Sequence, residues 1–160
     1  VITIVRKDLW KLRANQNINF FNSNKDVLSA KQYDQTKKYY TKAIPLVYKD
    51  FYGILSFSKF IFAYLVGIFK VMYRQLRSSD TRIVAHKSAA LASQNFMISM
   101  SGFGYDTCPM EGFDSLKLKN LLRLNKKSEI NMVIGCGIRS KEGVYGKRFR
   151  IPFEEVYFRK

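Results

Sequence analysis

One segment constrains the fold of this 160-residue chain more than any other. Residues 81–101 are rich in Ala, Met and Leu, and Gly102 and Gly104 follow as typical helix C-caps. Ser78, Ser79 and Asp80 offer N-cap side chains just before it. Small residues that would let another element pack closely recur along it, at Ala85, Ser88, Ala89, Ala92 and Ser93. We therefore predict a long core helix.

Two apolar segments predict strands that accompany this helix. Residues 1–5 include a run of β-branched side chains, which favours a strand. Residues 129–136 alternate and then end in the apolar run 132–134, which Gly135 and Gly137 bound as in a buried strand. With 47% hydrophobic residues and no internal repeat or flexible linker, the chain is predicted to form a single domain, 1–160.

The remaining segments carry weaker patterns. The polar stretch 15–24 predicts a loop, and 26–42 predicts a helix capped by Asp26 and ended by Pro45. Residues 105–113 contain Pro109 and Gly112 and predict a turn-rich connection. Asp114 is expected to cap a short helix that runs through Leu122.

The most apolar segment is 51–73. Its uninterrupted apolar run, 60–69, lies between Lys59 and Lys70 and is about half of the roughly 20 residues that span a bilayer. We expect a buried or dimer-interface helix. A transmembrane helix and an interfacial helix that contacts anionic lipid peripherally are the alternatives.

Charge and cysteine content limit the kinds of partner and the compartment that we expect. The 28 Lys and Arg against 12 Asp and Glu give a net charge of +16, which attracts phosphate groups, nucleic acid or acidic lipid without choosing among them. Cys108 and Cys136 lack the spacing of a CxxC pair or a zinc site, so we expect two reduced, buried thiols in a cytoplasmic protein.

Several catalytic constellations are excluded by composition and motif. His86 is the only histidine, which rules out metal sites built on several histidines. No GxSxG, P-loop or GxGxxG motif is present. We expect His86 to be a hydrogen-bonded structural residue and predict no metal site and no catalytic side chain.

A combination of motifs carries more information than any one of them. The pair Gln94-Asn95 lies on the long predicted helix, and the sequence GFGYDTCPMEGF follows it at 102–113. After the short helix and the glycine-bounded strand comes the basic sequence GKRFRIP at 146–152. This order resembles the C-terminal half of the nitroreductase family of flavoproteins, densely from about residue 82 to 155 and weakly at 1–8.

The resemblance implies an α/β (α+β) sandwich in which helices flank a mainly antiparallel sheet. It also implies an intertwined homodimer with FMN at the interface. NAD(P)H would reduce the flavin, and a nitroaromatic, quinone or similar acceptor would reoxidise it in a ping-pong scheme. We expect no nucleic-acid partner.

The resemblance also assigns cofactor-binding residues. Pro109, Met110, Glu111 and Gly112 match the family's turn, whose backbone N–H groups would face the flavin ring. Arg148 and Arg150 alternate along a tail that we expect to be extended, so both guanidinium groups could grip the flavin phosphate. The flavin itself would carry the chemistry.

Departures from the family pattern matter too. The family's N-terminal R-R-S-x-R and N-x-Q-P-W segments have no counterpart here, so we expect an N-terminally incomplete domain. Residues 31–77 would form a helical lid or pack on a second subunit. The alternatives are a related flavoprotein with dehydrogenase or dehalogenase activity, and a non-enzymatic basic protein that binds membrane or nucleic acid.

Overall fold

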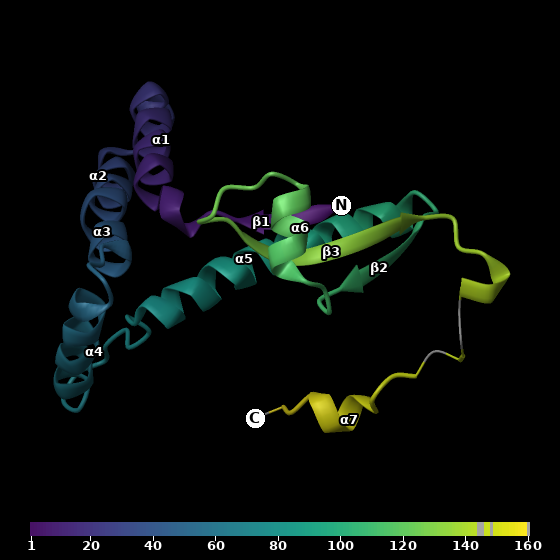
Figure 1. The fold of residues 1–160 in the computed structure, drawn as a ribbon. Coiled ribbons are helices and arrows are strands. Elements are labelled where there is room, and N and C mark those ends of the chain that lie inside the picture. Colours follow the sequence, from purple (N-terminus) through teal and green to yellow (C-terminus); the bar gives the residue numbers. More distant parts are fainter. Residues whose placement is uncertain (144–145, 148, 160) are drawn as a thin grey trace.

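A three-stranded antiparallel sheet lies at the centre of the chain (Figure 1). The computed structural model describes residues 1–143, 146–147 and 149–159. β1 (Ile2–Val5) and β2 (Asp106–Met110) both pair with the central strand β3 (Glu129–Gly137), which buries Ile130 and Ile134. The two strands that the sequence predicts are thus confirmed, and they are hydrogen-bonded neighbours.

Helices cover both faces of this sheet. Figure 1 shows α5 (Ser78–Gly102) behind the strands and α6 (Ser115–Leu121) in front of them. The hydroxyl of the fully buried Ser93 on α5 lies 2.9 Å from that of Thr3 on β1, so a small residue does allow close packing. Helices that flank an antiparallel sheet confirm the predicted fold class.

Both ends of α5 follow from the sequence. At the start, the Arg77 backbone N–H donates to the Asp80 carboxylate at 3.0 Å, so Asp80 lies inside the first turn and Arg77 is the N-cap. At the end, Gly104 has a φ of +82°, the left-handed conformation that closes many helices. The helix begins three residues earlier than predicted.

A helical arm, residues 10–66, extends to one side of the sheet (Figure 1). The short turn η1 (Lys7–Leu9) connects it to β1. Its elements are α1 (Trp10–Ser23), the 3₁₀ turn η2 (Lys25–Val27), α2 (Ala30–Lys38), the π-helical turn η3 (Tyr39–Ala43), α3 (Ile44–Tyr48) and α4 (Ile54–Val66).

The loop predicted at 15–24 is wrong, because α1 continues to Ser23. Ala14, Ile18 and Phe21 recur three and four residues apart among the asparagines, which places them on one side of a helix. Ala14 is buried. The packing of this side outweighs the low helix propensity of the surrounding Asn residues.

The helix predicted at 26–42 is partly wrong at both ends. Asp26 lies in η2, and Ser29 caps α2 instead, in a reciprocal pair with Gln32. Pro45 does not end the helical path but lies in the first turn of α3, where its missing N–H costs nothing.

The segment 51–73 forms α4 and the irregular residues after it, and it is not buried within this chain. Only Ser56 and Ala63 of α4 are buried, whereas the side chains of Phe57, Phe62 and Leu65 are exposed. No helix among the described residues has both the length and the apolar character needed to cross a bilayer. The prediction that this segment forms a helix at a dimer interface stays a prediction.

The turn-rich connection predicted at 105–113 is wrong over its first part, which is β2. Pro109 is tolerated there because β2 is an edge strand, where a missing N–H need not break a ladder. Past β3 lie η4 (Lys141–Gly143) and α7 (Phe153–Val156), and Arg150 lies between these two helices in neither of them.

Candidate functional site

The turn between β2 and α6 holds four of the six predicted cofactor-binding residues. Pro109 and Met110 are the last residues of β2, where they pair with Ile134 and Val133. Glu111 and Gly112 follow, and all four residues are exposed. The structure thus brings Pro109, Met110, Glu111 and Gly112 together at the end of one strand.

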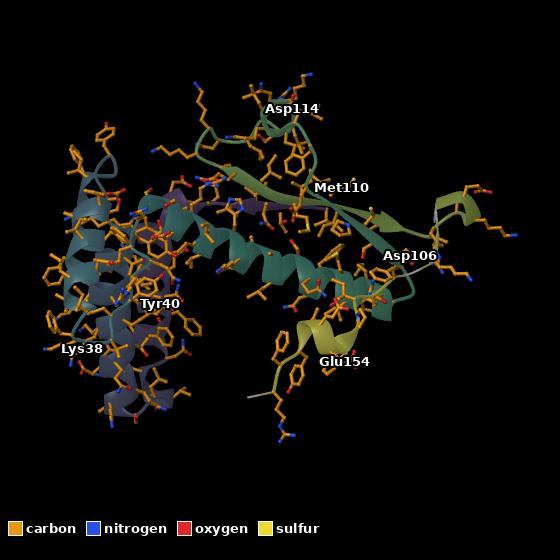
Figure 2. All side chains as sticks on the ribbon, turned by 90° about the horizontal axis from the view of Figure 1, so that it is seen from below. Lys38, Tyr40, Asp106, Met110, Asp114 and Glu154 are labelled. Carbon is orange, nitrogen blue, oxygen red and sulfur yellow. The ribbon has the colours of Figure 1, made fainter. Side chains whose placement is uncertain are left out.

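Both sides of this turn are anchored. The backbone N–H of Phe113 donates to the Glu111 carbonyl at 3.1 Å. The Asp114 carboxylate accepts the backbone N–H groups of Leu116 and Lys117 at 3.1 and 3.0 Å, as an N-cap of α6. Figure 2 shows Met110 and Asp114 on the same side of α5. A strand end and a capped helix therefore hold the backbone between them.

The turn offers unused hydrogen-bond donors. Within residues 1–143, 146–147 and 149–159, no group accepts a hydrogen bond from the backbone N–H of Glu111 or Gly112. A Cβ atom built on Gly112 would meet no atom within 4 Å. Two free donors beside open space are what an electron-rich ring edge needs, so these residues fit a flavin.

The basic tail lies apart from this turn. In Figure 2 α7 is on the other side of α5 from the turn, with Glu154 opposite Met110. Arg150 is exposed and donates to the carbonyl of its own neighbour Phe149 at 2.9 Å. Arg148 lies outside the described residues. A single chain therefore does not join the turn and Arg150 into one site.

His86 belongs to a hydrogen-bonded cluster on the α5 side of β3. Its Nε2 lies 3.0 Å from the Glu129 carboxylate, which can only accept, so Nε2 carries the proton. Its Nδ1 then accepts from the Asn131 amide at 3.2 Å. Both ring nitrogens are thus occupied, which agrees with the predicted structural role.

The Glu129 carboxylate is held ionised by this cluster. Burial opposes its ionisation, but hydrogen bonds from His86 and Arg82 outweigh that effect and lower the pKa of Glu129 below its ordinary value. The contact links α5 to the start of β3 and has the character of a structural ion pair.

The predicted burial of the cysteines is wrong. Cys108 and Cys136 are both free and exposed. Cys108 pairs with Gly135, and Cys136 pairs with Thr107, so the two thiols point to opposite faces of the sheet. They face away from each other because neighbouring positions of paired strands alternate in direction.

Two further kinds of site are relevant among the described residues: a metal site and a cavity. In the part of the chain that the structure describes, no group of three His, Cys, Asp or Glu side chains is placed to hold a metal ion. A cavity lined by Lys7, Trp10 and Arg13 was not predicted, because it depends on α1, which the polar composition of 15–24 concealed.

Known proteins resemble parts of this chain. "Protein DrgA" of Synechocystis sp. (strain ATCC 27184 / PCC 6803 / Kazusa) is 33% identical over 92 residues, which is 56% of this chain and 42% of DrgA. "Putative NAD(P)H nitroreductase MhqN" of Bacillus subtilis (strain 168) is 35% identical over 71 residues, which is 44% of this chain and 34% of MhqN. The matches thus span less than half the length of either relative.

Solved structures share the fold. The crystal structure of the Bacillus subtilis protein ydfN matches with a TM-score of 0.59 and 23% identity, over 94% of this chain and 59% of ydfN. That of the Nitroreductase Family Protein from Streptococcus pneumoniae TIGR4 matches with a TM-score of 0.62 and 16% identity, over 98% of this chain and 62% of that protein.

The family model supplies the broadest match in sequence. The model described as "Nitroreductase family" matches residues 7–138, which include α5, β2, the 109–112 turn, α6 and β3. This match covers most of the chain and agrees with the solved structures in fold. The chain belongs to the nitroreductase family.

Proposed function

We propose that this chain is part of an FMN-dependent oxidoreductase that takes electrons from NAD(P)H and delivers them to a conjugated organic acceptor. The observation that carries the proposal is the 109–112 turn, whose free N–H groups lie within the residues that the family model matches. When bound, FMN supplies the electron transfer itself. The side chains of this chain then bind and orient.

The turn would influence which redox state of the flavin ring is favoured. The N–H groups of Glu111 and Gly112 are fixed donors, and a fixed donor favours the state of the ring that carries more negative charge. The open space at Gly112 lets a flat ring approach the backbone closely. Pro109 restricts the backbone at the start of the turn, which helps to keep both donors in place.

The tail would bind the phosphate. Arg150 is exposed, and no carboxylate among the described residues is paired with it. Together with Arg148 it supplies two guanidinium groups to a dianion, a pairing with strong charge-assisted hydrogen bonds. Since the tail lies apart from the turn of its own chain, we infer that the complete site needs residues of a second copy.

A homodimer would also account for part of the exposed surface. The chain has an accessible surface of 13199 Å² for a mass of 18.7 kDa. A compact monomer of this mass would expose about 8,300 Å². The excess of about 4,900 Å² per chain is larger than the roughly 1,000–2,500 Å² that each partner buries in an obligate dimer, so such an interface would account for part of it.

The proposal also covers the electron donor, the electron acceptor and the cellular compartment. We infer a ping-pong scheme in which NAD(P)H leaves before a nitroaromatic, quinone or related acceptor enters the same space. The name of MhqN refers to NAD(P)H and to nitro compounds, which supports both choices. Two exposed, unbonded cysteines fit a reducing compartment, so we place the protein in the cytoplasm.

The test is spectroscopic and kinetic. We expect the full-length gene product, supplied with FMN, to show bound flavin absorption bands and to oxidise NADH or NADPH when a quinone or nitroaromatic is added. Parallel double-reciprocal plots would support the ping-pong scheme. A purified protein that stays colourless with FMN and oxidises neither nucleotide would refute the proposal.

A variant pair tests the phosphate site. Replacing Arg148 and Arg150 together by Ala is expected to weaken FMN binding by about 3 kcal/mol, at about 1.5 kcal/mol for each charged hydrogen bond. Arg159→Ala, in the same tail, is the matched control and is expected to bind FMN like the wild type. Equal FMN affinity in both variants would move the phosphate site elsewhere.

A further inference from the structure

A cavity lies where the helical arm meets the sheet. It has a volume of about 340 Å³ and lies between the end of β1, α1, α3 and α5. That size is within the usual range of small-molecule sites, roughly 300–1,000 Å³. Its lining combines three cationic with three aromatic side chains, namely Arg6, Lys7, Arg13, Trp10, Tyr40 and Tyr48.

Two of the three positive charges form no ion pair with a carboxylate of the described residues. Arg6 is neutralised by Asp8, which accepts from Nε and Nη2 at 2.9 and 2.8 Å. Lys7 donates to the carbonyl and hydroxyl oxygens of Ser78, and Arg13 donates to the side-chain amide of Gln16. Among the side chains that the structure describes, no carboxylate forms an ion pair with Lys7 or Arg13.

Lys7 is also partly desolvated. Burial lowers the pKa of Lys7, and the more distant carboxylates of Asp50 and Glu129 only partly oppose this effect. An ammonium group that has lost hydration gains more from a nearby anion than an exposed one does. The polar part of the cavity therefore favours an acidic group.

The aromatic part favours a flat ring. Trp10 and Tyr48 stack with ring centroids 6.3 Å apart and planes inclined by 25°. Ala85 and Ala89 of α5 line the cavity as well, and their short side chains leave room beside the rings. Aromatic rings bind flat apolar groups in offset stacks, so a planar ligand would be held against this pair.

We propose that this cavity binds a small planar aromatic anion, with its ring against Trp10 and Tyr48 and its acidic group at Lys7 and Arg13. The cavity lies at the end of β1, whereas the 109–112 turn follows β2, and β3 separates these two strands. The site is thus distinct from the flavin site of the proposed function and does not depend on it.

The test compares an acid with its neutral isostere. 4-Hydroxybenzoate and 4-hydroxybenzamide are titrated calorimetrically into the protein, with and without saturating FMN. We expect saturable binding of the acid at one site per chain, at least about tenfold tighter than the amide, since a charged hydrogen bond is lost with the amide. Trp10 is the single Trp of the sequence, so its emission should change in step with the heat.

Two matched variants locate the site. Arg13→Gln should weaken binding of the acid about tenfold and leave binding of the amide unchanged. Lys11→Gln removes the same charge from the same helix but lies outside the cavity, so it should change neither affinity. Circular dichroism confirms that each variant is folded.

Several outcomes would overturn the proposal. They are equal affinities for acid and amide in the wild type, equal effects of Arg13→Gln and Lys11→Gln, and a steady Trp10 emission. Displacement of the acid by FMN, or a shift of the flavin absorption bands when the acid binds, would place it at the flavin instead. The wild-type comparison and the Trp10 emission decide the question even if Arg13→Gln fails to fold.

Discussion

At the scale of single residues, Glu129 connects the sheet to α5. It lies at the first position of β3 and receives hydrogen bonds from His86 and Arg82, which lie four residues apart on one side of α5. Because its side chain is only 33% exposed, the contact is partly shielded from water and salt. The Arg82 side chain is 57% exposed, so this arm of the contact is screened more than the hydrogen bond to His86.

This contact predicts a pH-dependent contribution to stability. Glu129→Gln should lower the free energy of unfolding at pH 7 by about 1–2 kcal/mol, because two charged hydrogen bonds are weakened. Since folding lowers the pKa of Glu129, its contribution is complete above the ordinary pKa of a glutamate and is lost as the pH falls through the lowered pKa. The difference between wild type and variant should therefore shrink in acid.

Urea unfolding at neutral and acidic pH measures this difference. Glu142→Gln, at an exposed position of η4, is the matched control and should leave stability unchanged at both pH values. A Glu129→Gln variant as stable as the wild type at pH 7 would show that the cluster contributes nothing to the fold.

At the scale of elements, the caps decide where helices begin. Asp114 caps α6 and also fixes the far side of the 109–112 turn. Ser29 caps α2 in the same way, and its pairing with Gln32 moves the start of that helix past Asp26. A cap thus acts on the helix and on the loop that precedes it.

Removing the cap of α6 should be measurable. Asp114→Ala is expected to lower the free energy of unfolding by about 1 kcal/mol, because two backbone N–H groups lose their acceptor. Asp114→Asn keeps a side-chain oxygen at this position and should lose much less. Thermal unfolding followed by circular dichroism distinguishes the two variants, and equal melting temperatures would contradict the assigned cap.

At the scale of the whole molecule, one exposed side of α4 carries a continuous row of large apolar side chains. Its large apolar side chains recur three and four residues apart, so they form one stripe. They are Ile54, Phe57, Ile61 and Leu65. α4 also buries Ser56 and Ala63 on its opposite side. A large exposed apolar stripe is typical of a surface that a partner covers, and the second copy of the proposed dimer would cover this one.

Charges in this stripe should separate the copies. Ile61→Asp combined with Leu65→Asp is expected to convert a dimer to monomers in sedimentation velocity, because the interface would then bury two unpaired carboxylates. Asn19→Asp adds a charge to the exposed side of α1 and should leave the dimer intact. A monomeric wild type, or a double variant that still sediments as a dimer, would exclude this interface.

Local patterns in the sequence determined β1, β3, α5 and α6. Each carries its own signal within a few residues, such as the run 1–5, the glycines around 132–134 or the cap at Asp114. The motif at 102–113 also pointed to the turn residues Pro109, Met110, Glu111 and Gly112. Propensity, periodicity and capping are local effects, so a linear sequence is enough to predict them.

Only the tertiary structure decided the rest. β2 forms because β3, some 25 residues further on, offers a partner to its backbone, and α1 is stable because Ala14 and its neighbours pack. The cavity joins Lys7 and Trp10 to Tyr48 and Ala85, which no short motif connects. Strand pairing, burial and the desolvation of charges depend on groups far apart in the chain, so they appear only once the chain has folded.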